Sequence, residues 1–402
     1  MKRTFLFTVI LFSITMNAQQ FNYDQHWKEI ESLSKQGNVK SLLPKINEIY
    51  TQAKKDKNTV EIVRSLIEQQ QILQQTQEDA EGDACKLVIG NFEKEIAAFN
   101  GKDAQQCVST AVLQSLLAKI YENYAQNTQW DRFSMLETEN PPKDIAEWTT
   151  SRLQQKSFDL YKLSLENTDI LKNTKTENFK KILTSSEDIE LYPTLYDVLT
   201  MRYVIFLKNN EIEKIATELN ITSQPLVNHN ITQLLGFHFD DKDKSAFLNC
   251  KLAEIENQQA DNQTEKAELM LFLADKYKSE PFSAYIYYRA AQFYVENGDK
   301  KTAYEICVRA KDFLPLQNNK WQVNCENLMA ELEKQNLQVQ IDETSLPNEP
   351  IAVNITHTNL DGFFYRIYKI TETIENGNIN QNVGNIVKSG SWELRRFNDF
   401  SA

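Results

Sequence analysis

From Trp27 to about Leu337 the apolar residues recur every three or four positions, which is the period of an α-helix with one buried face. One such stripe runs over 39–53 and another over 108–124. A stripe buries only one side of a helix, so each helix needs neighbours. The pattern therefore predicts a mainly helical protein whose helices pack against one another.

Short breaks separate the stripes and predict where helices begin. Pro142 and Asp144 predict the start of a helix that carries Trp148, and Pro193 predicts the start of one that carries Leu195. Only ten Gly and nine Pro occur in 402 residues, which also favours long regular elements.

The stretch 287–315 matches the tetratricopeptide pattern, a helical hairpin that repeats about every 34 residues. Gly298 falls at the turn between the two helices, and Cys307 stands where the pattern usually has an aromatic residue. Small residues at such positions let the helices approach closely, and tyrosines fill the space beside them. The predicted packing residues are Tyr287, Ala291, Tyr294, Gly298, Ala303, Ala310 and Pro315.

One repeat cannot bury its hydrophobic face alone, so further hairpins are expected beside it. A weaker echo occurs near the start of the chain, at Trp27, Gly37, Leu42, Ile46 and Tyr50. The stretch 60–274 is helical but irregular. We therefore predict an irregular tetratricopeptide-like helical-repeat solenoid. Tyr285 and Tyr288 are candidates to line a binding groove on it.

After Leu337 the period changes to the alternation of β-strands, at 337–341, 351–355 and 364–370, with one more possible strand near Trp392. Pro, Gly and Asn residues separate these runs, including a Gly/Asn-rich turn over 376–385. About four strands are too few to close a β-sandwich. We expect an incomplete β-sandwich over 339–402 that stops inside a domain.

The first nineteen residues have the features of a secretory signal peptide, with Lys2 and Arg3 before a short apolar run that ends near Ala18. The predicted organisation is a signal peptide at 1–19, a helical-repeat domain at 20–338 and a β-rich region at 339–402. Removing Lys2 and Arg3 changes the net charge from −12 to −14, which disfavours nucleic acid as a partner. We expect export to the periplasm or cell envelope, with no transmembrane segment after signal cleavage.

The order of these parts resembles the N-terminal part of large bacterial alpha-2-macroglobulin-like proteins. The stretches that carry the resemblance are "DIAEWTTSRLQQKSFDLYKLSLEN" (144–167), "LYPTLYDVLTMR" (191–202), "FFYRIYKI" (363–370) and "SGSWELRRFNDF" (389–400). The resemblance implies a macroglobulin-like β region and an envelope protein that traps or inhibits proteases, often through a Cys–Gln thioester. No Cys here is followed two residues later by Glu-Gln, so no thioester residue is carried over.

Candidate chemistry is sparse. The four His residues lack metal-site spacing, and no G-x-S-x-G, Walker or dinucleotide glycine pattern occurs. The stretch 240–252 fails as a calcium loop because Ala246 and Leu252 stand where Gly and Glu are needed. The five Cys favour ordinary buried thiols, although a Cys307–Cys325 bridge between neighbouring helices stays open. No catalytic, cofactor-binding or metal-binding residue is predicted.

These observations favour a non-enzymatic exported scaffold or interaction segment of an alpha-2-macroglobulin-like protein. Its partner would be a protein, either a protease or another envelope component. The alternative is a free-standing tetratricopeptide-like adaptor that binds envelope proteins or glycans. A hydrolase has no supporting set of acid, base and nucleophile residues.

Overall fold

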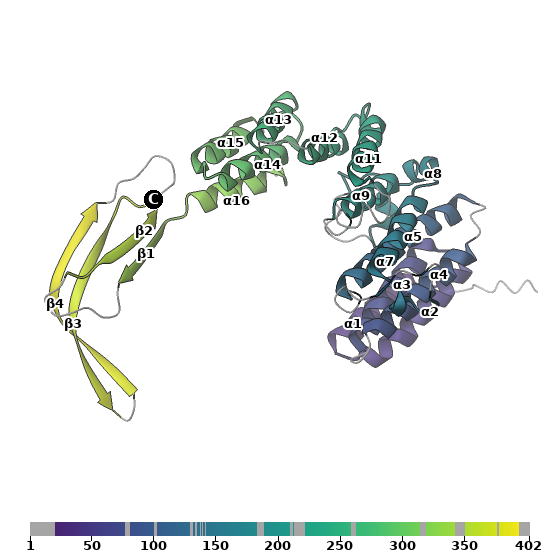
Figure 1. Ribbon diagram of the computed structural model, residues 1–402, viewed down its shortest axis with the longest axis horizontal. Helices are drawn as coiled ribbons and strands as arrows, with labels where there is room; N and C mark the ends of the chain where they lie inside the picture. Colours follow the sequence, from purple (N-terminus) through teal and green to yellow (C-terminus); the bar gives the residue numbers. More distant parts are fainter. Residues whose placement is uncertain are drawn as a thin grey trace, which may run out of the picture. The chain divides into compact units, whose positions relative to one another are not determined.

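The protein is mainly helical, with a few antiparallel strands near the end of the described chain (Figure 1). The computed structural model describes residues 21–76, 81–99, 103–128, 132, 135, 136, 138, 140, 142–182, 189–209, 212, 222–258, 263–313, 319–341, 350–375 and 378–393. The chain divides into two compact units, at residues 1–227 and 228–402. Each unit is described by itself below.

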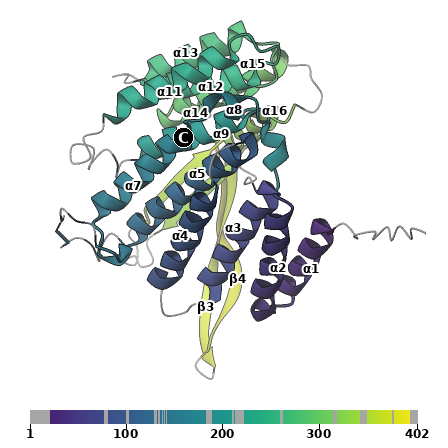
Figure 2. The same cartoon turned by 90° about the vertical axis from the view of Figure 1, so that its right-hand side faces the viewer.

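In the first unit, helices that follow one another in the sequence pack against one another. Each helix from α1 to α5 contacts the next one, and α5 also packs against α7. Figure 2 shows α1, α2 and α3 side by side. The elements are α1 (Tyr23–Lys35), a 3-10 turn (Val39–Ser41), α2 (Leu42–Lys55), α3 (Thr59–Thr76), α4 (Glu81–Ala98), α5 (Ala104–Asn127), a 3-10 turn (Ile145–Glu147), α7 (Thr150–Leu163), α8 (Thr168–Lys172), a 3-10 turn (Thr176–Phe179) and α9 (Leu195–Leu207).

The second unit continues with helices and ends in strands. The helix α11 (Ser223–His238) spans the division between the units. It is followed by α12 (Ser245–Asn257), α13 (Gln263–Lys276), α14 (Ser283–Glu296), α15 (Lys300–Phe313) and α16 (Gln322–Leu332). The consecutive pairs from α13 to α16 pack against each other, and α14 also contacts α16.

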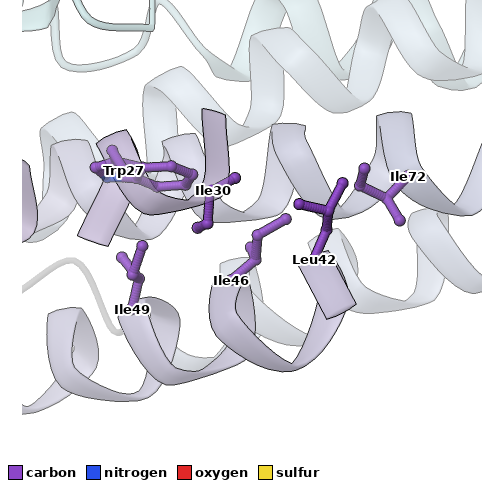
Figure 3. Close-up of a cluster of buried hydrophobic side chains, with 6 residues drawn as sticks. All are labelled: Trp27, Ile30, Leu42, Ile46, Ile49 and Ile72. Carbon is purple, nitrogen blue, oxygen red and sulfur yellow. The ribbon is translucent and has the colours of Figure 1, made fainter. Parts of the chain in front are cut away.

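The packing of α1, α2 and α3 follows directly from the helical stripes in the sequence. Figure 3 shows Trp27 and Ile30 of α1 above the side chains of α2, with Ile72 of α3 beside Leu42. The cluster consists of Trp27, Ile30, Leu42, Ile46, Ile49 and Ile72, all buried. Residues three or four positions apart share one face of a helix, so α1 and α2 each contribute an apolar strip to this core, to which α3 adds Ile72.

Three helices end in the same turn, in which the residue after the C-cap adopts a left-handed conformation. Gly37 has φ +72° and Gly298 has φ +83°, whereas Lys57 adopts φ +55° without being a glycine. At each turn this residue donates its N–H three residues back, and the next residue donates five residues back. For Gly298 these bonds are to Val295 O at 2.9 Å and from Asp299 N to Tyr294 O at 2.8 Å. This is the Schellman motif, which satisfies the last carbonyls of a helix.

Buried carboxylates connect helices in the first unit. Glu61 accepts a hydrogen bond from Trp27 Nε1 at 2.6 Å, and Glu95 accepts one from the Tyr50 hydroxyl. Both carboxylates are only 3% exposed. Lys54 Nζ lies 2.8 Å from Glu95 and balances its charge. Because an unpaired buried charge is costly, these donors are part of what holds the helices together.

The region around Trp148 differs from the prediction. The side chain of Asp144 caps Ala146 N at 2.9 Å, but only the 3-10 turn 145–147 follows. Trp148 is extended, with ψ 143°, and α7 begins after Thr149, whose hydroxyl accepts from Arg152 N. The predicted helix start at Pro142 was therefore wrong. The start after Pro193 is confirmed, since Thr194 and Asp197 form a capping box at the beginning of α9.

The strands form two separate antiparallel hairpins. β1 (Asn336–Ile341) pairs with β2 (Val353–Thr358), and β3 (Gly362–Glu375) pairs with β4 (Asn378–Glu393). The first strand begins at Asn336, slightly before the predicted start of the β region at 339. β4 is also longer than the single strand expected near Trp392, because most of the predicted turn at 376–385 pairs with β3. Asn359 Nδ2 donates to Leu332 O at 2.7 Å, which joins this region to the end of α16.

Candidate binding surfaces

The predicted repeat residues lie on α14 and α15 and at the turn between them. Tyr287 and Ala291 on α14, and Ala303 and Ala310 on α15, have no exposed surface. Gly298 occupies the left-handed turn position. Tyr294 is half-buried, and its carbonyl accepts the 2.8 Å hydrogen bond from Asp299 N. Pro315 lies outside the described residues. The hydroxyl of Tyr287 donates to Asp275 of α13 at 2.5 Å.

Of the two tyrosines proposed for a groove, Tyr288 lines the groove described here and Tyr285 is not part of its lining. A groove of about 270 Å³ lies between α14 and α16. Its lining residues are Tyr288, Gln292, Val295 and Glu296 of α14 and Asn324, Asn327, Leu328 and Glu331 of α16. Tyr285 instead packs on Trp321, with ring centroids 5.7 Å apart. Trp321 was not among the residues that the sequence pattern marked, because it precedes α16 and lies outside any stripe.

A larger groove, of about 530 Å³, lies in the first unit between α1 and α3 (Figure 3 shows the apolar cluster beneath it). We call it the N-terminal groove. Its floor is apolar and its walls are charged. Its lining residues are Asp24, Trp27, Lys28, Ile30, Glu31, Ser34 and Lys35 of α1, Leu42 of α2, and Arg64, Glu68 and Ile72 of α3. Only Trp27 and Leu42 among them were singled out from the sequence, as parts of a weak repeat.

Polar contacts fix one end of the N-terminal groove. The guanidinium of Arg64 lies 4.0 Å from the centre of the Trp27 ring, a cation–π contact. Lys181 Nζ bridges Asp24 at 2.8 Å and the buried Glu61 at 3.5 Å. The hydrogen bond from Lys181 is the main reason that the pKa of Asp24 lies below its ordinary value. The Trp27 ring and its neighbours are therefore held in one orientation.

The two β-hairpins expose a large amount of apolar surface. On β1 and β2 the alternation places Leu337, Val339 and Ile341 on the same face as their partners His357, Ile355 and Val353. Most of these side chains are exposed, as are those on the second hairpin. Among the described side chains of β3 and β4, the exposed large apolar residues are Phe364, Ile367, Tyr368, Ile370, Ile386, Val387 and Trp392. We call these residues of β3 and β4 the hairpin surface.

Charged residues of both signs accompany the hairpin surface. Arg366 and Lys369 lie on β3 and Lys388 lies on β4, all exposed, and the same two strands carry Glu372, Glu375 and Glu393 in their sequence. The whole chain carries a net charge of −12. A large exposed apolar surface is typical of a binding surface.

The cysteines are free thiols in this structure, including Cys307 and Cys325, which are buried on the neighbouring helices α15 and α16. Cys325 Sγ donates to Ala284 O at 3.4 Å. Burial raises the pKa of the Cys85 thiol to about 11. No group of three or more His, Cys, Asp or Glu side chains in the described ranges could hold a metal ion.

Within the described part of the chain, every helix falls short of the length and apolar character that crossing a membrane requires. Comparisons with protein-family models, with curated proteins and with solved structures find no match to this chain.

Proposed function

We propose that this protein is a non-enzymatic, exported scaffold of the cell envelope that serves protease trapping or inhibition. In this proposal the helices form an irregular tetratricopeptide-like array that holds a macroglobulin-like β region against its partner. The resemblance to alpha-2-macroglobulin-like proteins supports the proposal, as does the order of the parts, in which packed helices precede antiparallel strands.

The single observation that carries the proposal is the hairpin surface. Phe364 is 89% exposed and Val387 is 67% exposed, and other large apolar side chains of β3 and β4 are exposed as well. Covering one such side chain completely stabilises a complex by about 1.5–3 kcal/mol. Open strand edges beside the patch offer unpaired N–H and C=O groups as well. A surface of this kind is suited to binding, whereas a chemical reaction would need convergent polar groups.

A protease-trapping assay tests the proposal. Protein purified from its native cell envelope, with an antibody against residues 20–338, is mixed with purified proteases of several specificities. A trapped protease keeps its activity on a small chromogenic peptide but loses activity on casein, because enclosure excludes only large substrates. Equal activity on the two substrates, for every protease tested, would refute trapping.

Two matched substitutions connect that assay to the hairpin surface. Val387→Lys places a charge on the surface, whereas Val323→Lys places one at a 48% exposed position on α16. We expect Val387→Lys to abolish the selective loss of casein cleavage and Val323→Lys to leave it unchanged. If the two variants behave alike, the hairpin surface does not carry the function.

A second candidate function, a free-standing adaptor, is favoured by the groove between α14 and α16. Its lining offers the side-chain amides of Gln292, Asn324 and Asn327, which both donate and accept hydrogen bonds. A photo-crosslinking residue in place of Asn327 would then form a discrete adduct with an envelope protein or glycan in living cells. The same residue in place of Asn91, on α4 and outside the groove, is the control. If neither position forms an adduct, this candidate is excluded.

A further inference from the structure

The N-terminal groove has charges that alternate along its length. Two successive helical hairpins make α1 and α3 run in the same direction. Residues of the two helices therefore lie side by side at successive positions along the groove, which we call levels. Lys28 and Arg64 form the first level, next to Trp27, and Glu68 lies one helical turn further along α3. Ile72 lies another turn along, near Leu42 on the floor.

Some charged side chains of the groove form ion pairs within the protein, and others do not. Asp24 is paired with Lys181 at 2.8 Å, and Glu31 is paired with Lys35 at 2.7 Å. Lys28 and Arg64 lie close enough to Asp24 to help lower its pKa, but no ion pair to Lys28, Arg64 or Glu68 occurs among the described residues. The groove thus presents two cations, then one anion, then an apolar end.

The spacing of these levels fits an extended peptide. Four residues of helix rise about 6 Å, and two residues of an extended strand rise about 6.6 Å. Side chains at alternate positions of an extended chain point to the same side. Every second side chain of a bound segment would therefore meet the next level of the groove.

Arg64 is well suited to the first level. A guanidinium that stacks on an aromatic ring through its face keeps its N–H donors at its edge, where a carboxylate accepts two of them. Stacking on the buried Trp27 holds Arg64 in one conformation, so less side-chain entropy is lost on binding.

We propose that the N-terminal groove binds an extended peptide segment with an acidic, then a basic, then an apolar side chain at every second position. The acidic side chain lies between Lys28 and Arg64, the basic one faces Glu68, and the apolar one contacts Ile72 and Leu42. This inference concerns the first unit and does not depend on protease trapping or on the hairpin surface.

Fluorescence anisotropy with the full mature chain tests the proposal. The probes are labelled synthetic peptides with Asp-Ser-Lys-Ser-Leu and its reverse, Leu-Ser-Lys-Ser-Asp, because either direction of binding gives the same levels. The controls exchange Asp and Lys and so keep the composition. We expect one of the two probes to bind at least about tenfold more tightly than its control, as one charge-assisted hydrogen bond would give. Equal affinities, or no binding at millimolar protein, would overturn the proposal.

Variants then identify the residues. Arg64→Gln and Lys28→Gln should each weaken the probe about tenfold, while Lys55→Gln, at an exposed position on α2 outside the groove, should not. Circular dichroism checks that each variant folds. The combined variant Lys28→Glu, Arg64→Glu and Glu68→Lys should reverse the preference and bind the exchanged peptide. A folded combined variant with the original preference would also overturn the proposal.

Discussion

Gly298→Ala should destabilise the hairpin of α14 and α15 through the backbone alone. Gly298 has φ +83°, and a Cβ built on it has no heavy atom within 4 Å. An L-residue in the left-handed region costs about 1–2 kcal/mol, whereas alanine restricts the unfolded chain and stabilises by about 0.4–1 kcal/mol. The net expectation is a loss of about 1 kcal/mol, or a change of about fivefold in the local opening equilibrium.

Hydrogen exchange measured by mass spectrometry is the suitable assay, because it reports the opening of each helix separately in a chain with two units. Amides of α14 and α15 should exchange about fivefold faster in Gly298→Ala, and those of α1 to α5 should not change. The control is Gly90→Ala in α4, where the added Cβ also has open space but φ is ordinary. Alanine is the better helix former, so Gly90→Ala should slow exchange. If Gly298→Ala slows exchange as well, the account of the turn is wrong.

Three further predictions follow from the same structure. Lys57→Gly should stabilise α2 and α3 by up to about 1 kcal/mol, because φ +55° disfavours Lys; slower urea unfolding is expected, and faster unfolding would contradict it. Tyr50→Phe should cost about 1.5–3 kcal/mol by removing the donor to the buried Glu95, whereas Tyr23→Phe, at an exposed pair, should cost under about 1 kcal/mol in the same titration. Burial and Glu95 raise the pKa of Tyr50 above its ordinary value of 10.0, and burial raises that of Tyr203. The stability they contribute is complete below pH 10.0 and is lost above it, since the unfolded chain releases these protons first; a urea midpoint that is unchanged as the pH rises past that value would refute this.

The turns illustrate what could be predicted from the sequence and what could not. The tetratricopeptide pattern places Gly298 at a turn, and Gly37 belongs to its weaker echo near the start of the chain. Both adopt positive φ, which glycine does without strain. Lys57 forms the same turn with no sequence signal, because the packing of α2 against α3 imposes it. The prediction of a helix that carries Trp148 was wrong for a related reason. A proline and a capping aspartate mark the start of a helix, but they do not determine its length.

The strand that was predicted least well is β4. Its first half reads "NINQNVGN", in which Asn and Gly indicate a turn and only Ile379 and Val383 suggest a strand. Pairing with β3 supplies the backbone hydrogen bonds for this segment, so its conformation depends on a partner that a local reading does not include.

The candidate surfaces were harder to predict because each joins residues from different helices. Trp27 and Arg64 meet although 36 residues lie between them in the sequence, and nothing in the stripe of α3 marks Arg64 as a residue that stacks on an aromatic ring. Tyr288 could be proposed for a groove because it lies beside the buried Tyr287 on the same helix. Its amide neighbours Asn324 and Asn327 come from α16, and only the packing of α16 beside α14 brings them to the same groove.

Each of the two grooves lies between two helices that pack against the same third helix. In the first unit the groove lies between α1 and α3, both of which pack against α2; in the second it lies between α14 and α16, both of which pack against α15. In each case a helix, a left-handed turn and a second helix precede the third. The middle helix buries its small and apolar residues, so the faces of the outer helices are left to form the groove walls. Substitutions on those walls should change binding with little effect on folding, whereas substitutions at Ala303 or Ile46 should impair folding first.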